Sequence, residues 1–181
     1  MPAKIHLRPA VLADAAAIAT LHAAVWHDTY RDLATPEALA ALTEAHRLKQ
    51  WQSMLAADDP QRRTTVAVMM EEIIAFAQTA PSSEPLFAGR AELKYLYVAG
   101  HQARRGIGRL LISDAADSLL RQGYRALGLG VVAGNEEAIR FYRALGGREA
   151  GRYTDPGPLW RSENLLYVWD DLTLLAQGSV G

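Results

Sequence analysis

The feature that most constrains this chain is a glycine- and arginine-rich segment, 102–111, between an apparent strand and an apparent helix. Gly106 and Gly108 flank Ile107 and let the backbone turn tightly, so successive amide N–H groups can converge on one anion. The N-terminal end of the following helix adds unsatisfied donors and a positive dipole. The arginines that bring mobile positive charge are Arg104, Arg105 and Arg109. The segment predicts a pyrophosphate-binding loop.

Two other phosphate-binding loops can be tested against the same residues. The Walker loop requires a Gly-Lys-Ser/Thr run, and the chain has none. The dinucleotide fingerprint requires a third glycine at position 111, which is Leu111. A plain loop before a helix stays open as an alternative, because a Gly-x-Gly pair alone is a weak signal.

Composition limits the classes of function. With 181 residues, half of them hydrophobic, the chain is long enough for one well-filled core, and we expect a single domain over 1–175 followed by a disordered tail at 176–181. The 19 basic and 20 acidic residues nearly cancel, which argues against a nucleic-acid partner or an anionic membrane surface. No apolar run approaches a membrane span and no signal peptide is evident, so we expect a cytoplasmic protein.

Side-chain chemistry is limited in the same way. The chain has no cysteine, which excludes disulfides, thiolate metal sites and a cysteine nucleophile. Its five histidines show no i,i+4 pair and no accompanying carboxylates, so we expect no metal. Any acyl transfer must then proceed without a cysteinyl intermediate.

Hydrophobic periodicity and capping residues predict the elements. Strands are expected near 5–8, 64–70, 73–79, 91–98, 126–133, 148–154 and 162–170. Asp14, Thr35, Thr43 and Asn135 are expected to begin helices, and a further helix should run from the arginine loop to Gly123. This order predicts an α/β fold with a mixed sheet and helices on both of its faces.

Three local expectations follow from these elements. Alternation over 91–98 places Glu92 with Lys94, Leu96 and Val98 on one face and Leu93, Tyr95 and Tyr97 on the other. The hairpin over 64–79 has Glu71-Glu72 at its turn, which is poor chemistry for a tight primed turn. Gly128 and Gly130 mark a bulge or a close approach to the backbone.

Three stretches together resemble a known family. Ala91–Val98, Arg104–Gly108 and Asn135–Gly146 are similar, in order and spacing, to motifs of the GCN5-related N-acetyltransferases (GNAT). The resemblance implies a mostly antiparallel sheet of six or seven strands, splayed at its centre. It also implies an acetyl-CoA site, with the pyrophosphate on the loop amides and the pantetheine arm along Leu96, Tyr97 and Val98. The family usually has Gln or Arg where this chain has Ala103, so Gln102 or Arg104 would have to replace that contact.

Amine acetylation requires a base for the ammonium and an acid for the leaving thiolate. The family places a tyrosine beside the CoA sulfur at the position of Tyr142, our candidate acid; a core aromatic is the alternative. Glu92 lies fourteen positions before Gly106 (106 − 92), as does the family's general-base glutamate; an ion-paired strand glutamate is equally consistent. Asn135 is expected to cap its helix and to touch the pantetheine amide.

The acceptor is not named by the sequence. The resemblance suggests that Trp26, Tyr30 and Glu163 line the acceptor side of the cleft, although each can equally be a packing or solvent-facing residue. We predict an acetyl-CoA-dependent N-acetyltransferase acting on a primary amine, which a small molecule or a peptide could carry. A non-catalytic acyl-CoA-binding module is the alternative, and a homodimer is left open.

Overall fold

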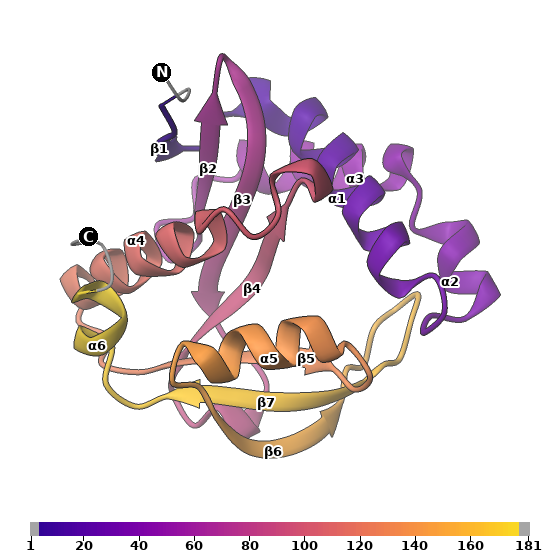
Figure 1. Ribbon diagram of the computed structural model, residues 1–181. Helices are drawn as coiled ribbons and strands as arrows, with labels where there is room; N and C mark the ends of the chain where they lie inside the picture. Colours follow the sequence, from indigo (N-terminus) through magenta and orange to yellow (C-terminus); the bar gives the residue numbers. More distant parts are fainter. Residues whose placement is uncertain (1–3, 178–181) are drawn as a thin grey trace.

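The computed structural model describes residues 4–177 (Figure 1). Its strands are β1 (His6–Pro9), β2 (Arg63–Met69), β3 (Glu72–Pro81), β4 (Ala91–Val98), β5 (Leu127–Val132), β6 (Arg148–Thr154) and β7 (Glu163–Trp169). Its α-helices are α1 (Ala15–Tyr30), α2 (Pro36–Ala41), α3 (Glu44–Ala56), α4 (Ile107–Arg121), α5 (Glu136–Ala144) and α6 (Thr173–Ala176). Positions 178–181 of the expected tail lie outside the described residues, whereas Ala176 is the last residue of α6.

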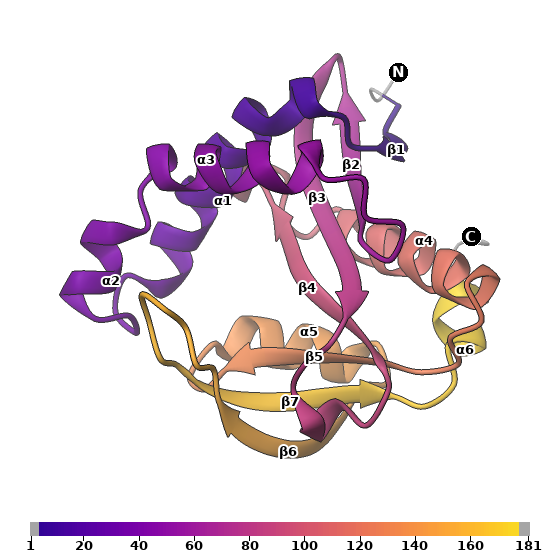
Figure 2. The same ribbon diagram turned by 180° about the vertical axis from the view of Figure 1, so that it is seen from behind.

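The strands form one seven-stranded sheet in the order β1-β2-β3-β4-β5-β7-β6. All neighbours are antiparallel except β4 and β5, which pair in parallel only at Ala91 with Leu127 and Glu92 with Gly128. Beyond those two pairs the strands separate, and β5–β7 run across the direction of β2 and β3 (Figures 1 and 2). The predicted mixed sheet, splayed at its centre, is confirmed.

Helices cover both faces of the sheet, as predicted. α4, α5 and α6 pack on one face, around a core that includes Leu111, Leu129 and Tyr167. α1 and α3 pack on the other face of β2–β4, around Ile18, Trp51 and Phe76. We call these the α4 face and the α1 face of the sheet. Seen from behind, α1–α3 lie on the side of β4 away from α4 (Figure 2).

The predicted helix starts are all present, with one correction. The side chains of Thr35, Thr43 and Asn135 accept hydrogen bonds from backbone N–H groups in the first turns of α2, α3 and α5. Asp14 precedes α1, but its carboxylate does not cap that helix. It is instead paired with the Arg8 guanidinium at 2.7 Å and 2.9 Å and accepts from the Val11 amide.

The β2–β3 hairpin turns one residue earlier than expected. Met69 pairs with Glu72, and the two residues between them, Met70 and Glu71, both have positive φ, 49° and 67°. This is the backbone of a type I′ turn, which Asn-Gly normally supplies. Neither residue is suited to it, so the register is set by strand pairing and not by turn chemistry.

A bulge in β4 overturns the expected faces of that strand. Gln78 pairs with Tyr95 but Thr79 pairs with Leu93, so Lys94 is an extra residue on β4. Alternation therefore reverses across Lys94. Leu93 packs with the core on the α4 face, and Glu92 lies on the α1 face together with Tyr95 and Tyr97. The sequence prediction had placed Glu92 opposite the two tyrosines.

Candidate active site

A cleft of about 690 Å³ lies where β4 and β5 separate. It is bounded by the end of α1, β4, the loop before α4, β5 and the first turns of α5. The predicted site residues that line it are Tyr30, Leu96, Tyr97, Val98, Ala103, Arg104, Gly106, Ile107, Gly108, Asn135 and Tyr142. Arg105, Arg109, Glu92, Trp26 and Glu163 are not among its lining residues.

The loop before α4 presents a row of unused backbone donors. Arg104 and Gly106 both have positive φ, 62° and 79°, and the first helical hydrogen bond runs from the Leu110 N–H to the Gly106 carbonyl. Within the described residues, nothing accepts from the N–H groups of 104–109. Such a concave row at a helix N-terminus is an anion-binding arrangement.

Two of the loop's arginines, Arg104 and Arg105, differ in whether their side chains are held by neighbours. Arg105 donates from Nη1 to Gln102 Oε1 at 2.6 Å, so Gln102 lines the cleft but its side-chain oxygen already holds Arg105. The side chain of Arg104 is 86% exposed, and its nearest acidic atom, Glu137 Oε1, is 3.9 Å away. Arg104 is thus the residue free to replace the side chain missing at Ala103.

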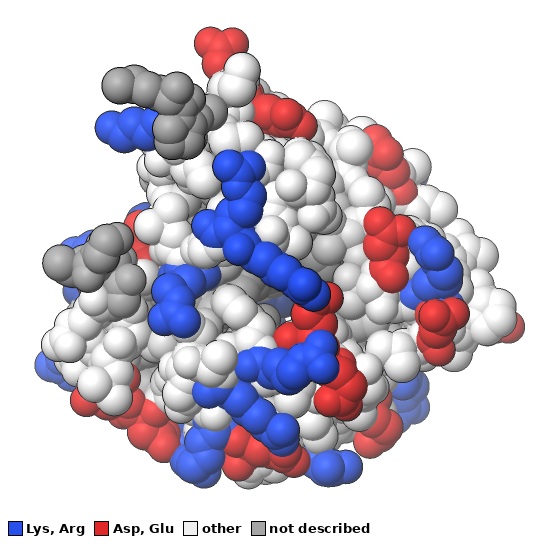
Figure 3. All heavy atoms as spheres, viewed as in Figure 1, with Lys and Arg blue, Asp and Glu red and all other residues white. Residues whose placement is uncertain are grey.

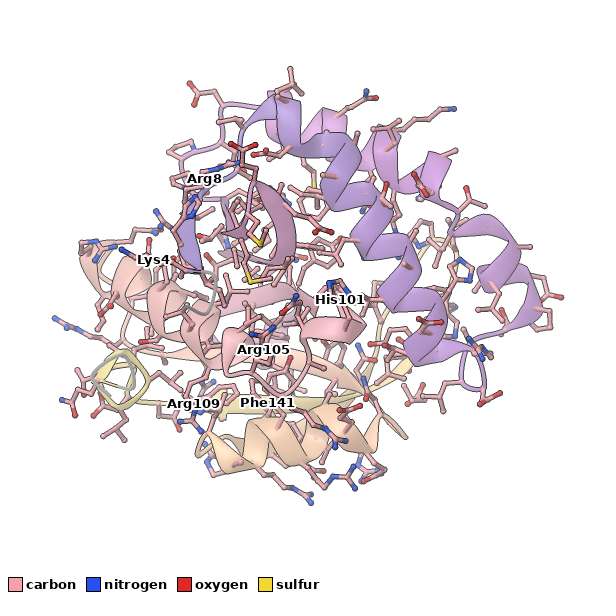
Figure 4. All side chains as sticks on the ribbon, turned by 45° about the horizontal axis from the view of Figure 1, so that its top comes forward. Lys4, Arg8, His101, Arg105, Arg109 and Phe141 are labelled. Atoms are coloured by element: carbon pink, nitrogen blue, oxygen red, sulfur yellow. The ribbon has the colours of Figure 1, made fainter. Side chains whose placement is uncertain are left out.

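Positive charge gathers around this loop. Lys and Arg side chains form a band across the middle of the face shown in Figure 3, over the beginnings of α4 and α5. In Figure 4, Arg105 and Arg109 lie beside the start of α4, close to Phe141 of α5. An anion held on the loop amides would therefore meet additional cations at the rim of the cleft.

Phe141 also explains the second loop glycine. A Cβ at Gly108 would lie 3.1 Å from the Phe141 ring, so the absence of a side chain lets α4 and α5 approach closely. This approach sets the width of the cleft between the two helices.

Tyr142 faces the cleft from α5 and is 9% exposed. Its ring contacts Phe141 and Trp169, with centroids 5.3 Å and 6.0 Å apart, whereas none of the hydrogen bonds found within residues 4–177 involves its hydroxyl. Burial, and to a lesser extent Tyr30, raise the pKa of Tyr142 well above its usual value. The phenol therefore stays protonated and is a proton donor with no competing acceptor.

Two more tyrosines line the cleft from the α1 face. Burial and then Tyr30 raise the pKa of Tyr97 well above its ordinary value, while Arg47 acts in the opposite direction. Burial also raises the pKa of Tyr30, partly offset by Asn135 and Tyr97 beside its hydroxyl. All three phenols are therefore neutral at ordinary pH.

Glu92 lies behind the cleft wall. Its carboxylate is 2.8 Å from the Lys94 ammonium, and the side chains are 17% and 29% exposed. Lys94 itself lines the cleft, because the bulge inserts it there. The structure thus places the candidate base next to the cleft but already paired with a cation.

Tyr153, the first residue of the segment 153–160 that the resemblance also suggests for the acceptor side, lies over Gly130 in β5. A Cβ at Gly130 would be 2.0 Å from the Tyr153 hydroxyl and 3.0 Å from Asn164 Nδ2, so the glycine leaves the space that these groups fill. Burial raises the pKa of Tyr153 to about 12, with Asn164 acting against burial and Glu92 adding to it. Of the two alternatives predicted for Gly130, a bulge or a close approach to the backbone, the structure shows the close approach of Tyr153.

The residues suggested for the acceptor side separate into two groups. Trp26 is 4% exposed, and its ring lies 5.4 Å from that of Tyr30 and 5.7 Å from that of Trp160, in the connection between β6 and β7. Glu163 instead lies on the edge of that hairpin and accepts from Thr154 Oγ1. Trp26 and Tyr30 therefore belong to one aromatic cluster, which Glu163 does not join.

Within residues 4–177, no group of three or more His, Cys, Asp or Glu side chains could hold a metal ion. The same residues form no helix that is both long and apolar enough to cross a membrane.

Comparison with known proteins identifies the family. The sequence profile of the acetyltransferase (GNAT) family matches residues 24–146, more than half of the chain. The protein belongs to the GNAT family. It is therefore an acyl-CoA-dependent N-acetyltransferase by class.

Individual GNAT relatives agree with this assignment. The chain is 27% identical to the uncharacterized N-acetyltransferase YuaI of Bacillus subtilis over 77% of this chain and 78% of that one. It is 30% identical to the phosphinothricin N-acetyltransferase of Streptomyces coelicolor over 55% of this chain and 59% of that one. YncA of Salmonella typhimurium, solved with acetyl-CoA, has a similar fold, with a TM-score of 0.67 and 20% identity over 92% of this chain and 94% of that one.

Proposed function

We propose that this GNAT protein transfers the acetyl group of acetyl-CoA directly to a primary amine, within a ternary complex. The observation that carries the proposal is the convergence of three features on one cleft: the free amides of 104–109, the unpaired edge of β4 and the unpartnered Tyr142 hydroxyl. The chain has no cysteine to carry the acetyl group, which favours direct transfer.

The cofactor would lie along β4. The amides of 104–109 would bind the pyrophosphate, with Arg104 and Arg109 at its rim. The backbone of Leu96–Val98, which has no β5 partner, would pair with the pantetheine arm as a strand would. Asn135 Oδ1 already accepts from the Ala138 N–H, and its amide NH2 lies beside the Tyr30 hydroxyl. An NH2 group has two hydrogens, so the second would donate to a pantetheine carbonyl.

The chemical step would need three proton transfers. Glu92 would receive the proton of the entering ammonium, directly or through a water molecule. The neutral amine nitrogen would then bond to the acetyl carbon as the C–S bond breaks, and Tyr142 would give its proton to the departing thiolate. The surplus proton on the nitrogen of the new amide would return to the Tyr142 phenolate, and Glu92 would release its proton to solvent. The amide N–H groups of β4 around Tyr97 would stabilise the carbonyl oxygen as charge develops on it.

Calorimetric titration with acetyl-CoA, followed by thiol release with an amine panel, tests the proposal. The panel contains polyamines, amino acids, aminoglycosides, peptides with free N-termini and phosphinothricin, the last because the Streptomyces relative is named for it. We expect micromolar binding and amine-dependent thiol release. Binding without release on any acceptor would favour the non-catalytic acyl-CoA-binding module.

Tyr142→Phe tests the acid. It should lower kcat by about 10²–10⁴-fold, the usual worth of a general acid, and leave CoA affinity within about twofold. Tyr124→Phe, at the far end of α4 and outside the cleft, is the matched control. Unchanged turnover in Tyr142→Phe would remove this residue from the mechanism.

Glu92→Gln tests whether Glu92 is the base, and Lys94→Gln, which breaks the same ion pair, is its control. It should lower kcat by a similar factor, because the amide cannot take a proton. Lys94→Gln breaks the same ion pair but keeps the carboxylate, and should retain most of the turnover. If both variants lose the same activity, the ion pair matters and Glu92 is not the base.

A further inference from the structure

Arg47, in the first turn of α3, is a buried cation without a counter-ion. The residue is 6% exposed, and no carboxylate of residues 4–177 pairs with it. Its Nη1 donates to Gln50 Oε1 at 3.0 Å, its Nε has no partner, and no described group accepts from its Nη2. The guanidinium thus keeps unused donors in a buried position.

The protein gives Arg47 only weak compensation. Its guanidinium carbon lies 5.8 Å from the centre of the Trp26 ring, a contact worth about 0.5–2 kcal/mol. Removing a charged group from water costs several kcal/mol even after relaxation. Burial lowers the pKa of Arg47, and Tyr97 and Tyr95 oppose that effect, but an arginine remains charged in proteins. A bound anion would supply the missing compensation.

Arg47 is not among the residues that line the cleft, but it lies behind the wall that Tyr95 and Tyr97 form. Gln50, its hydrogen-bond partner, donates to the Tyr95 hydroxyl at 3.2 Å, and Tyr95 lines the cleft. Trp26, its ring partner, packs against Tyr97 and Trp160. These contacts are on the α1 face, opposite the α4 face where the free amides begin the helix. α3 and the connection between β6 and β7 lie on this same side in Figure 2.

The charged residues that line the cleft are Asp28, Lys94, Arg104, Glu136 and Glu137. Glu92 and Lys94 form one ion pair, and Asp28 and the exposed Arg31 form another at 2.9 Å. Burial keeps the phenols of Tyr30 and Tyr97 neutral. Arg47 differs from these groups because it is a buried charge with no counter-ion within residues 4–177. A polyamine would bring further positive charge toward it, whereas a molecule with both an amine and an anion would not.

We propose that Arg47 binds a carboxylate of the acceptor, so that the substrates of this enzyme are amino acids and their analogues, not polyamines. This inference rests on the proposed acetyl transfer. One guanidinium nitrogen or two would donate to the carboxylate, and the amine of the same molecule would point toward the acetyl group.

Steady-state kinetics with matched acceptors test this inference. Each amino acid of the panel is compared with its decarboxylated amine, at saturating acetyl-CoA. In the wild type, kcat/KM for at least one amino acid should exceed that for its amine by more than tenfold. Arg47→Gln should lower kcat/KM for the amino acid about 10- to 100-fold, as expected of one charge-assisted contact, and leave the amine's value within about threefold. Arg47→Lys should recover part of the preference.

Lys49→Gln is the matched control, because it removes an exposed positive charge two residues away on the same helix. The inference would be overturned if Arg47→Gln lowered kcat/KM equally for the amino acid and its amine, or if the wild type preferred the decarboxylated amines. In either case thiol release would still support acetyl transfer. If no amine released thiol, the proposed function would fail instead. Thermal unfolding with CoA would then decide: a carboxylate-bearing compound must raise the Tm of the wild type but not that of Arg47→Gln.

Discussion

Gly130→Ala should destabilise the protein through one identifiable collision. The added Cβ would lie 2.0 Å from the Tyr153 hydroxyl and 3.0 Å from the Tyr153 Cζ. To reach even 3.0 Å, the oxygen must move by at least 1.0 Å (3.0 minus 2.0). Tyr153 cannot move freely, because it packs with Phe87, Leu166 and Val168 in a small cluster on the same face of the sheet.

The size of the effect follows from two opposing terms. Forcing extra atoms into a filled site lowers the free energy of unfolding by about 1–3 kcal/mol. Replacing a glycine raises it by about 0.4–1 kcal/mol, because the unfolded chain loses conformational entropy. We expect a net loss of about 1–2 kcal/mol, or roughly 2–8 °C in Tm for a chain of this length. Tyr153→Phe alone should cost about 1 kcal/mol, because it removes the hydroxyl beside Asn164.

A double-mutant cycle separates the collision from general damage. With Tyr153→Phe present, the closest atom is removed, so Gly130→Ala should cost at least about 1 kcal/mol less than it does in the wild type. Thermal and urea unfolding of the four proteins measure the coupling, and Gly100→Ala, where a Cβ meets nothing within 4 Å, is the control. Additive losses in the cycle would refute the assigned contact.

Two further predictions concern stability. His22 is fully buried, and its Nδ1 accepts a hydrogen bond from Trp51 Nε1. Burial lowers the pKa of His22 to about 2. Below pH 6.5, therefore, His22 takes up a proton in the unfolded chain but not in the folded protein. Its contribution should therefore fall by about 1.4 kcal/mol for each pH unit below 6.5, and urea unfolding of His22→Gln should show a flatter pH dependence than the wild type. Replacing Met70-Glu71 by Asn-Gly should raise the urea midpoint by an amount equivalent to about 1 kcal/mol at constant m, since both residues have positive φ; an unchanged midpoint would contradict the strain.

Local signals predicted much of the fold and the cofactor half of the site. The caps at Thr35, Thr43 and Asn135 are short-range hydrogen bonds, so they can be read from neighbouring residues. The loop before α4 is equally local, because its donors are backbone amides that depend on glycine conformation and helix start. These features need no knowledge of distant strands.

The contacts on the candidate acceptor side depend on long-range pairing, which local signals do not show. The Tyr153 hydroxyl lies over Gly130 only because β6 pairs with β7, and β7 with β5. Arg47 is an ordinary helix residue in the sequence, and its lack of a counter-ion is visible only once α3 is packed against α1 and β4. A basic residue in a helix predicts solvent exposure, and tertiary packing overrides that prediction.

The bulge at Lys94 decides on which face of the sheet the candidate base Glu92 lies. Without it, Glu92 would share the α4 face with Leu96 and Val98, on the same side of the sheet as Tyr142. The extra residue moves Glu92 to the α1 face, with Tyr95 and Tyr97 and on the side where Arg47 lies. The candidate acid and the candidate base thus lie on opposite faces of the sheet, with Tyr142 lining the cleft and Glu92 behind its wall. In the proposed transfer the base acts on the entering amine and the acid on the departing sulfur, so two proton-transfer groups on different sides of the acetyl group suit it.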